Sequence, residues 1–370
     1  MKSNGEHLRS ELFDVSISLL GNRLLMQAID GDFSVSLQRS QTMGPVDALL
    51  AEARSFMKSR IILTAAELDF FTFLDKKNCS AEILAKEKKL DVRATTRVLD
   101  CLITFGLLKK RGAEYALTDQ GAFYSSRRSE TILPMILHMN GLWNTWSKLT
   151  DVLKTGQHEP KEPGIHMDEG FWKSFIGAMH VIGSKLAQRI ARNVDVSRFR
   201  RLLDIGGASG TYTIAFLRQN PTLKAVIFDL KHVIPMAKER LREEGIENRV
   251  DLVVGDFYKD ELPRGCDLAL LSAIIHQNSP ENNLGLFQKI YTALEPGGTV
   301  LIRDHIMDES RTKPASGAIF AINMLVFRHG GDTYTFSEVK AGLEQAGFTD
   351  VKQLQYGEEM DSVVVGQKPA

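Results

Sequence analysis

The chain has 370 residues, of which 43% are hydrophobic, so it is long enough for two domains with a substantial buried core. Its 46 Lys and Arg residues balance its 46 Asp and Glu residues, which gives a formal net charge of +0. This balance excludes a chain-wide electrostatic field that would attract nucleic acid, an anionic membrane or an acidic substrate. We therefore expect a partner to be recognised at a local site, and we expect neither nucleic acid nor a membrane as partner.

The cysteines and the start of the chain indicate the compartment. Cys79, Cys101 and Cys266 lie far apart and form no CxxC pair, which argues against a disulfide framework and a structural zinc site. No apolar run is long enough to cross a bilayer, and residues 1–10 are polar, unlike a signal peptide. We expect a cytoplasmic protein. A metal site is suggested by the histidines His138, His180 and His305, but no two histidines show a short ligand spacing. We therefore expect no metal.

The first part of the chain divides into an arm and a long helix. Residues 1–44 form an arm to which we assign no function, with a helix expected over residues 11–29. Residues 47–74 predict a single helix, and its part over 61–74 is apolar on nearly every side. Such a helix must be buried on several sides. We expect it to pack against a second copy of the chain in a homodimer; the alternative is a central helix of the chain's own core.

The next segment has the pattern of a winged helix. The expected elements are a helix over 80–89, a second helix over 91–105 and a two-stranded hairpin over 107–118. Winged helices often bind DNA, but the second helix offers only Arg93 and Arg97 as cations, which is poor equipment for phosphate or base contacts. We therefore interpret residues 45–130 as a winged-helix dimerisation domain.

Residues 131–195 are expected to be helical, with a break over 157–170, and to form a linker beside the substrate pocket. Their aromatic and methionine side chains recur at helical spacing, which is most typical of a hydrophobic core. Some of them must nevertheless cover the pocket beneath.

From residue 196 to the end we expect an α/β domain with a Rossmann-like, doubly wound sheet of about seven strands. Short apolar strands alternate with helices over 202–205, 225–229, 251–254, 268–272 and 300–304, which is typical of a parallel sheet covered on both faces. The last two strands, 351–356 and 362–367, are separated by too few residues for a parallel crossover. The last strand should therefore run antiparallel. A helix over 336–345 with a capping box at its start precedes this pair.

A glycine-rich turn follows the first of these strands. The run DIGGASGT over 204–211 lets a ligand approach bare backbone, and a helix starts directly after it. The fingerprint of nicotinamide-binding enzymes, GxGxxG, would require three glycines where this chain has Gly206, Ala208 and Thr211. The interpretation as a nicotinamide site is therefore weakened. Asp229 ends the second strand and suits a ribose, because a carboxylate accepts hydrogen bonds from both sugar hydroxyls. Asp256, after the third strand, is a candidate for the adenine amino group.

In order along the chain, the sequence shows the runs LLDIGGASGTYTIAFL, VIFDL, GDFYKD, LLSAIIHQNSPENN, LEPGGTVLIRDHIMDE and GGDTYTF. With these motifs, most of residues 47–368 resembles the small-molecule O-methyltransferases, which include plant caffeate and flavonoid enzymes, the animal acetylserotonin enzyme and bacterial relatives. The resemblance implies S-adenosyl-L-methionine as cofactor. It also implies that the winged helix serves in dimerisation and in closing the active site.

The resemblance assigns parts of the cofactor to parts of the chain. The loop over 206–210 would hold the methionine part, Asp229 the ribose, and Asp256 with Phe257 the adenine. Ser272 lies where plant members carry a cofactor-contacting lysine, and Ala208 replaces a customary glycine. The cofactor-binding residues expected in this way are Asp204, Gly206, Gly207, Gly210, Asp229, Asp256, Phe257 and Ser272. The plainer alternatives are that Asp204 only caps the loop and that Asp256 only ends a strand.

Methyl transfer to a phenol, whose pKa is near about 10, benefits from a base at neutral pH. His276 follows the fourth strand, at the carboxyl edge where open sheets bind ligands. Asp304 ends the fifth strand and is placed to hold one imidazole nitrogen, although Arg303 and His305 are alternative partners for it. Family members have a histidine at the position of His276 as general base and a carboxylate at that of Asp304.

Two departures from the family lead us to expect a less rigidly held base. Gln277 replaces the usual aspartate, and Thr333 replaces a second carboxylate of the plant enzymes.

By family position, the acceptor pocket would be lined by Met179 and Met324, and by Trp143 and Phe175, although each of these side chains would also suit a core. Soft and aromatic side chains fit a flat or apolar acceptor. We therefore expect an S-adenosylmethionine-dependent O-methyltransferase that acts on a hydroxyl of a small aromatic or apolar metabolite. The alternatives are a C-, N- or S-methyltransferase on the same fold, and a non-catalytic winged-helix regulator that senses S-adenosylmethionine.

Overall fold

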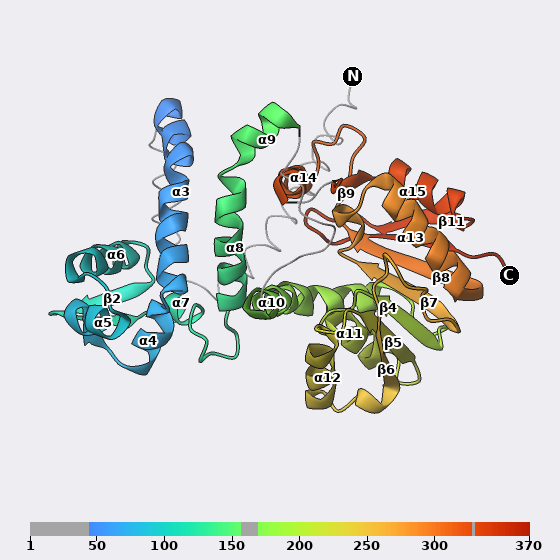
Figure 1. Cartoon of the computed structure of the whole chain (residues 1–370), viewed down its shortest axis with the longest axis horizontal. Helices are drawn as coiled ribbons and strands as arrows, with labels where there is room; N and C mark the ends of the chain where they lie inside the picture. The colour runs from blue at the N-terminus through green and yellow to red at the C-terminus, as the bar shows by residue number, and fades with distance from the viewer. Residues whose placement is uncertain (1–43, 157–168, 328–329) are drawn as a thin grey trace, which may run out of the picture. The chain divides into compact units, whose positions relative to one another are not determined.

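The computed structural model describes residues 44–156, 169–327 and 330–370 (Figure 1). The chain divides after Ile61 into two units. The predicted arm over 1–44 lies outside the described residues except for Gly44, as does most of the predicted break over 157–170. Within the described ranges, no helix combines the length and the apolar character needed to cross a membrane. All three cysteines are free.

The single helix predicted over 47–74 is wrong, because the chain forms two helices there. They are α3 (Pro45–Glu67) and α4 (Phe70–Lys76). Asp69, between them, adopts the left-handed conformation with φ 58° and ψ 40°. A right-handed helix cannot continue through such a residue, and aspartate is one of the few non-glycine residues that tolerates it.

The large apolar side chains of the segment 61–74 are only partly available for packing against a second copy. Leu63, Phe70, Phe71 and Leu74 are at most 7% exposed within this one chain. Phe71 stacks on Tyr124 with 4.8 Å between the ring centroids. These side chains belong to the chain's own core, which was the alternative interpretation.

The predicted helix–helix–hairpin arrangement is present. It consists of α5 (Ala81–Lys88), α6 (Val92–Thr104) and the strands β2 (Leu108–Arg111) and β3 (Glu114–Leu117), with a short strand β1 (Cys79–Ser80) paired to β3. The side chain of Asp91 caps α6 by accepting from the Ala94 N–H at 2.7 Å. Leu99 and Leu102 on α6 are fully buried. The helix that would read DNA in other winged helices therefore contributes an apolar face to the core.

The middle of the chain is helical where it is described, as predicted. It contains α7 (Asp119–Ala122), α8 (Leu133–Trp146), α9 (Leu149–Thr155) and α10 (Glu169–Asn193). Helix α8 packs against α10 and also contacts α14 (Ala315–Phe327). Trp146 Nε1 donates to Asn323 Oδ1 at 2.9 Å, so a hydrogen bond joins α8 to α14.

The carboxyl-terminal half forms the predicted seven-stranded sheet. Its strands are β4 (Arg201–Ile205), β5 (Lys224–Asp229), β6 (Val250–Val254), β7 (Cys266–Ser272), β8 (Leu294–Asp304), β11 (Thr349–Gln355) and β12 (Ser362–Gln367). They lie in the order β11-β12-β8-β7-β4-β5-β6. The last strand, β12, is antiparallel to both of its neighbours, as predicted. Strand β8 begins at Leu294, earlier than expected.

Helices cover both faces of this sheet, because its strands bury side chains on both sides. The helices are α11 (Thr211–Gln219), α12 (Ile234–Glu243), α13 (Pro280–Ala293) and α15 (Phe336–Gln345). One core layer lies between the sheet and α13 and α15, and the other lies between the sheet and α10, α11 and α12 (Figure 1). Consecutive strand residues alternate between the layers: Leu203 and Ile205 face the first, whereas Leu202 faces the second. The predicted capping box at Thr335 and Glu338 opens α15.

The sheet order creates a switch point between β4 and β7. From β4 the chain continues outward to β5 and β6, and it then returns to build β7 and β8 on the other side. Open α/β sheets bind ligands at the carboxyl ends of the strands at such a point. A short parallel pair that was not predicted, β9 (Ile306–Met307) with β10 (Tyr334–Thr335), lies directly after Asp304.

Candidate active site

The glycine loop joins β4 to α11 and presents bare backbone. Gly206 has φ 68° and Gly210 has φ 73°, conformations that favour glycine. A Cβ atom on Gly206 would lie 2.8 Å from Ile274 Cδ1, and one on Gly207 would lie 2.8 Å from Asp204 Cγ. Ala208 also has a positive φ, of 49°. The loop is therefore tightly curved over its neighbours and has no room for larger side chains at these glycines.

Asp204 supports this loop from inside the protein. Its side chain is 1% exposed and accepts a hydrogen bond of 2.6 Å from Thr213 Oγ1 on α11. Burial raises the pKa of Asp204 to about 6, although the Thr213 hydroxyl opposes this shift. This location fits the interpretation in which Asp204 caps and braces the loop.

Asp229, the last residue of β5, is bonded to the same loop. Its Oδ2 accepts from the Ala208 N–H at 2.8 Å, and its Oδ1 accepts from the Leu230 N–H at 2.7 Å. Burial raises the pKa of this carboxyl, and the two backbone donors act in the opposite direction. The carboxylate is thus held at the carboxyl edge of the sheet, next to the glycine loop.

Asp256 and Phe257 follow β6 and also lie near the glycine loop. Phe257 Cε1 is 3.6 Å from the position that a Cβ on Gly206 would take. Asp256 Oδ1 accepts from the Tyr258 N–H at 3.0 Å, which shapes the turn. The Phe257 carbonyl accepts from Lys289 Nζ at 3.0 Å. The predicted loops after β4, β5 and β6 therefore meet at the carboxyl edge of the sheet.

A polar network that sequence reasoning missed, buried except at Tyr258, connects this turn to the next one. Tyr258 donates its hydroxyl to Asn278 Oδ1 at 2.6 Å, and Asn278 Nδ2 donates to Asn283 Oδ1 at 2.9 Å. The Tyr334 hydroxyl donates to the carbonyl of Asn278, which is 1% exposed. No local sequence signal reveals this network, because its members come from three separate segments.

His276 lies on the short helix η2 (Ile275–Gln277) after β7 and is paired with Asp304 at the end of β8. The two oxygens of Asp304 lie 2.9 and 3.0 Å from His276 Nδ1. Asp304 is fully buried and also accepts from the His305 N–H at 2.8 Å. Burial would raise the pKa of Asp304, but His276 and Arg303 together hold it below its usual value. Because Nδ1 is engaged, Nε2 is the ring nitrogen that remains for an acceptor.

Arg303, a neighbour of this pair, makes contacts of its own. Its Nε donates to Ser272 Oγ at 2.9 Å, and its NH1 donates to the Met360 carbonyl at 2.7 Å. The predicted cofactor residue Ser272 therefore has an oxygen that accepts from Arg303 and a hydroxyl hydrogen that it can still donate.

The two departures from the family pattern do not leave His276 without support. Thr333 Oγ1 donates to the Gly317 carbonyl at 3.4 Å and so has a different partner. The backbone N–H of Asp332 donates to the His276 carbonyl at 2.9 Å. The imidazole is positioned by Asp304 and by Phe320, whose ring meets it edge-on with 4.9 Å between centroids.

Phe320 on α14 contacts two imidazoles and was not singled out by sequence reasoning. Besides His276, it meets the ring of His305 at a centroid distance of 5.0 Å. His305 is 4% exposed, and burial lowers its pKa to about 4, so its ring is neutral at physiological pH. The available signal was the spacing of Phe320 and Met324, which are four residues apart and share one helix face.

The predicted acceptor residues lie on three helices. Met324 on α14 is buried, whereas Met179 on α10 and Trp143 on α8 are half-buried. Phe175 lies on α10, but its side chain is outside the described part of the structure. Contacts of α8 with both α10 and α14 link the helices that carry these residues.

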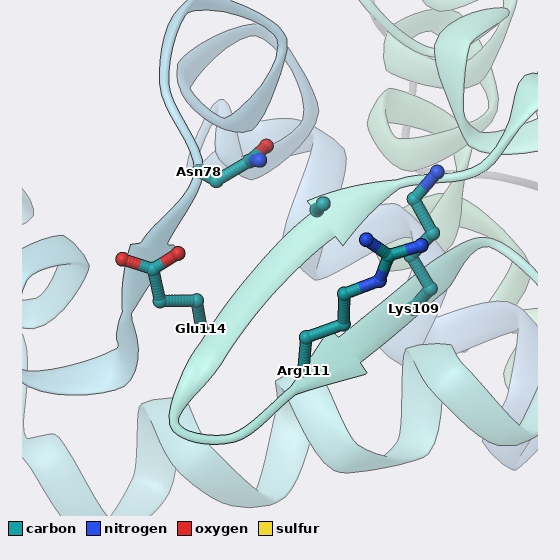
Figure 2. A pocket seen from close by; sticks show the side chains of 5 residues that line it. Asn78, Lys109, Arg111 and Glu114 are labelled. Carbon is teal, nitrogen blue, oxygen red and sulfur yellow. The ribbon is translucent and has the colours of Figure 1, made fainter.

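A hollow of about 180 Å³ lies on the winged-helix hairpin and is shown in Figure 2. Lys109 and Arg111 project together from β2, and Glu114 and Asn78 lie across from them (Figure 2). It contains none of the predicted site residues, and its lining carries both signs of charge. In the described ranges, no three His, Cys, Asp or Glu side chains are grouped so that they could hold a metal ion.

Two family models match this chain. The family model of the O-methyltransferase domain matches residues 146–349, and that of the O-methyltransferase dimerisation domain matches residues 51–127. The tetracenomycin polyketide synthesis 8-O-methyltransferase TcmO of Streptomyces glaucescens is 30% identical over 333 residues, which cover 88% of this chain and 97% of that protein. The chain belongs to the O-methyltransferase family.

Two further relatives of this O-methyltransferase are informative. The 3-hydroxy-5-methyl-1-naphthoate 3-O-methyltransferase of Streptomyces sahachiroi is 29% identical over 325 residues, covering 85% of this chain and 93% of that protein. The structure of human N-acetylserotonin methyltransferase in complex with S-adenosylmethionine superposes with a TM-score of 0.77 at 25% identity, covering 89% of this chain and 99% of that one. The chain is therefore an S-adenosylmethionine-dependent methyltransferase.

The residues of this O-methyltransferase fit that cofactor. The glycine loop offers backbone that a ligand can approach closely, because side chains are excluded at Gly206 and Gly207. Asp229 supplies a fixed carboxylate beside the loop, and the Phe257 ring also lies close to the loop, at Gly206. A carboxylate for sugar hydroxyls and an aromatic ring for a base are the groups that an adenosine requires.

Proposed function

We propose that this enzyme methylates a hydroxyl group of a small aromatic metabolite, with His276 as the general base. The observation that carries the proposal is the contact of both Asp304 oxygens with His276 Nδ1. A histidine held in this way has a fixed tautomer, because the hydrogen on Nδ1 is donated to the carboxylate. Its Nε2 then has a free lone pair for the proton of an acceptor.

The chemistry divides between cofactor and protein. When bound, S-adenosylmethionine supplies a methyl group that is already activated by the sulfonium charge. His276 removes the acceptor's hydroxyl proton at Nε2, and Asp304 stabilises the imidazolium that forms. Deprotonation matters because a phenol with a pKa near about 10 is mostly a weak, neutral nucleophile at pH 7. Orienting the oxygen toward the methyl group is the remaining task of the pocket.

The cofactor assignments come from the family resemblance, and the meeting of these loops at the carboxyl edge supports them. The loop over 206–210 would hold the methionine part, with Asp204 as its internal brace. Asp229 would accept from the ribose hydroxyls, and Asp256 with Phe257 would contact the adenine. Ser272, whose oxygen accepts from Arg303, would contact the cofactor through its hydroxyl.

The acceptor assignments come from family position, and a contact of α14 with His276 supports them. Phe320 meets the imidazole directly, and Met324 lies one turn further along the same helix. With Met179, Trp143 and Phe175 they would form an apolar pocket suited to a flat ring. The names of two relatives, one of polyketide synthesis and one a hydroxynaphthoate enzyme, support an aromatic hydroxyl as acceptor.

A homodimer is proposed on different grounds from those of the sequence analysis. The dimerisation family model covers residues 51–127. Large apolar side chains on the first part of α3 are 46–73% exposed in the single chain: Val46, Leu49, Leu50, Phe56 and Met57. Apolar residues at such density are typical of a protein–protein interface. Light scattering after size exclusion would reveal a monomer if the proposal is wrong.

The decisive experiment combines cofactor binding with an acceptor screen. The purified protein is titrated with S-adenosylmethionine and S-adenosylhomocysteine, with NAD as a control, and then incubated with panels of phenols, amines and thiols. We expect S-adenosylhomocysteine to form with a phenol and His276→Ala to lose most of that activity. A thiolate acceptor would lose little in this variant, because it needs no base. Absence of cofactor binding by the folded protein would overturn the proposal.

A further inference from the structure

His180 on α10 links this helix to the glycine loop through side chains alone. Its Nδ1 lies 2.9 Å from Oγ1 of Thr211, the first residue of α11. Its Nε2 lies 2.8 Å from NH1 of Arg240 on α12. Thr211 Oγ1 in turn lies 3.0 Å from Ser209 Oγ within the loop. Four side chains thus form one chain of contacts from α12 through α10 to the loop.

The chemistry of the donors gives this chain a single direction. A guanidinium carries only donors, so Arg240 donates and Nε2 of His180 must accept. The ring is then neutral with its hydrogen on Nδ1, which it donates to Thr211. The hydroxyl of Thr211 is free to donate onward to Ser209. Hydrogen bonds aligned in this way polarise and strengthen one another.

The surroundings of His180 favour this arrangement. Burial lowers the pKa of His180, the positive charge of Arg240 lowers it further, and Glu244 acts in the opposite direction. Ser209, at the far end of the chain of contacts, is 3% exposed. A Cβ on the buried Gly183 would lie 3.5 Å from Tyr212 Cε2 and 3.7 Å from Thr211 Cγ2, so α10 approaches the start of α11 closely.

We propose that His180 is a positioning residue, which holds Thr211 and Ser209 so that the glycine loop is shaped for the methionine part of the cofactor before it binds. The inference rests on the proposed function, in which the loop over 206–210 binds S-adenosylmethionine. Met179 precedes His180 on α10, so the same helix carries a proposed acceptor contact and the support of the cofactor loop. A rigid loop binds its ligand with a smaller loss of entropy than a mobile one.

The test measures binding of S-adenosylhomocysteine by calorimetry, which needs no turnover. His180→Ala removes both links, and Thr211→Val removes the hydroxyl while keeping the shape. We expect each to raise the Kd roughly 3- to 10-fold, the effect of one lost hydrogen bond. His180→Asn puts an amide N–H where Nδ1 lies and should restore most of the affinity. Lys185→Ala, at an exposed position on the same helix, is the matched control and should leave the Kd unchanged.

A double-mutant cycle separates positioning from general damage to the fold. If the residues act through one link, His180→Ala combined with Thr211→Val should weaken binding no more than the stronger single variant. Fully additive effects, or an unchanged Kd in folded His180→Ala, would overturn the inference. If His180→Ala fails to fold, the other two variants decide. Weakened binding by Thr211→Val together with retained binding by His180→Asn supports the inference. Equal binding by these two variants opposes it. Wild-type protein that binds no S-adenosylhomocysteine would refute the proposed function instead.

Discussion

Asp304 contacts Nδ1 of His276 with both carboxylate oxygens, at 2.9 and 3.0 Å, from the end of the neighbouring strand. Strand register places the two ends side by side, because Ser272 on β7 pairs with Arg303 on β8, and the short helix η2 then carries His276 to Asp304. The carboxylate is fully buried, so it has little freedom to take another partner. This pair is the centre of the proposed chemistry and the first target for mutation.

Asp304→Asn should lower kcat by roughly 10²- to 10⁴-fold, the range associated with general-base catalysis. The amide can present an N–H to Nδ1, which would move the histidine's hydrogen to Nε2 and block proton removal. Initial rates with a phenolic acceptor provide the measurement. The Kd for S-adenosylhomocysteine should not change. The control is Asp332→Asn, which changes a half-exposed carboxylate outside the His276–Asp304 pair. An equal loss of kcat in this control would contradict a specific role for Asp304.

Asp229→Ala should weaken binding of S-adenosylmethionine roughly 10- to 100-fold, because hydrogen bonds to a charged acceptor contribute more than neutral ones. The variant also removes the acceptor for the Ala208 N–H, so the glycine loop loses a tie. Calorimetric titration gives both Kd values. Asp251→Ala, at an exposed carboxylate of the adjacent strand β6, should bind normally. Normal binding by Asp229→Ala would exclude this residue from the ribose site.

Gly207→Ala should destabilise the protein by about 1–3 kcal/mol, as overpacking of a tight site does. The new methyl would lie 2.8 Å from Asp204 Cγ and 3.1 Å from Ile227 Cγ2. Gly285→Ala in α13 is the matched control, because a Cβ there meets nothing within 4 Å. The free energy of unfolding of the control should rise by about 0.5–1 kcal/mol, because alanine has a higher helix propensity than glycine. Thermal unfolding compares the two, and equal stabilities would show that the loop can relax around the methyl group.

Asp204→Asn should change how stability depends on pH. The pKa of Asp204 is about 6 in the folded chain and lies near 3.8 without the fold. The folded state therefore binds more protons between these values, and wild-type stability falls as pH rises from about 4 to 6 because of this group. The variant cannot ionise at this position. Its free energy of unfolding should therefore rise relative to that of wild type over this interval, by an amount on the order of 2–3 kcal/mol. Denaturant unfolding across the pH interval from 3.8 to about 6 and beyond it measures the difference; a constant offset would mean that Asp204 titrates normally.

The sequence determined the features that depend on local pattern and short separation. Alternating strands and helices predicted the parallel sheet, and the short connection before residue 362 predicted the antiparallel last strand. The turn between strand and helix located the glycine loop, and the positions of His276 and Asp304 after neighbouring strands predicted their contact. These inferences succeed because strand order and direction restrict where strand ends can lie.

Only the tertiary structure decided which partners the remaining side chains have. The break at Asp69 overrides an apolar pattern that continues through it, because a left-handed residue ends a helix whatever its neighbours are. The burial of Phe70 and Phe71 in the chain's own core depends on distant segments such as the one that carries Tyr124. The contacts of His180 with Thr211 and Arg240 and of Phe320 with two imidazoles likewise join residues far apart in sequence. The physical reason is that propensity and periodicity specify which face of an element is buried, whereas packing of whole elements decides which atoms meet on that face.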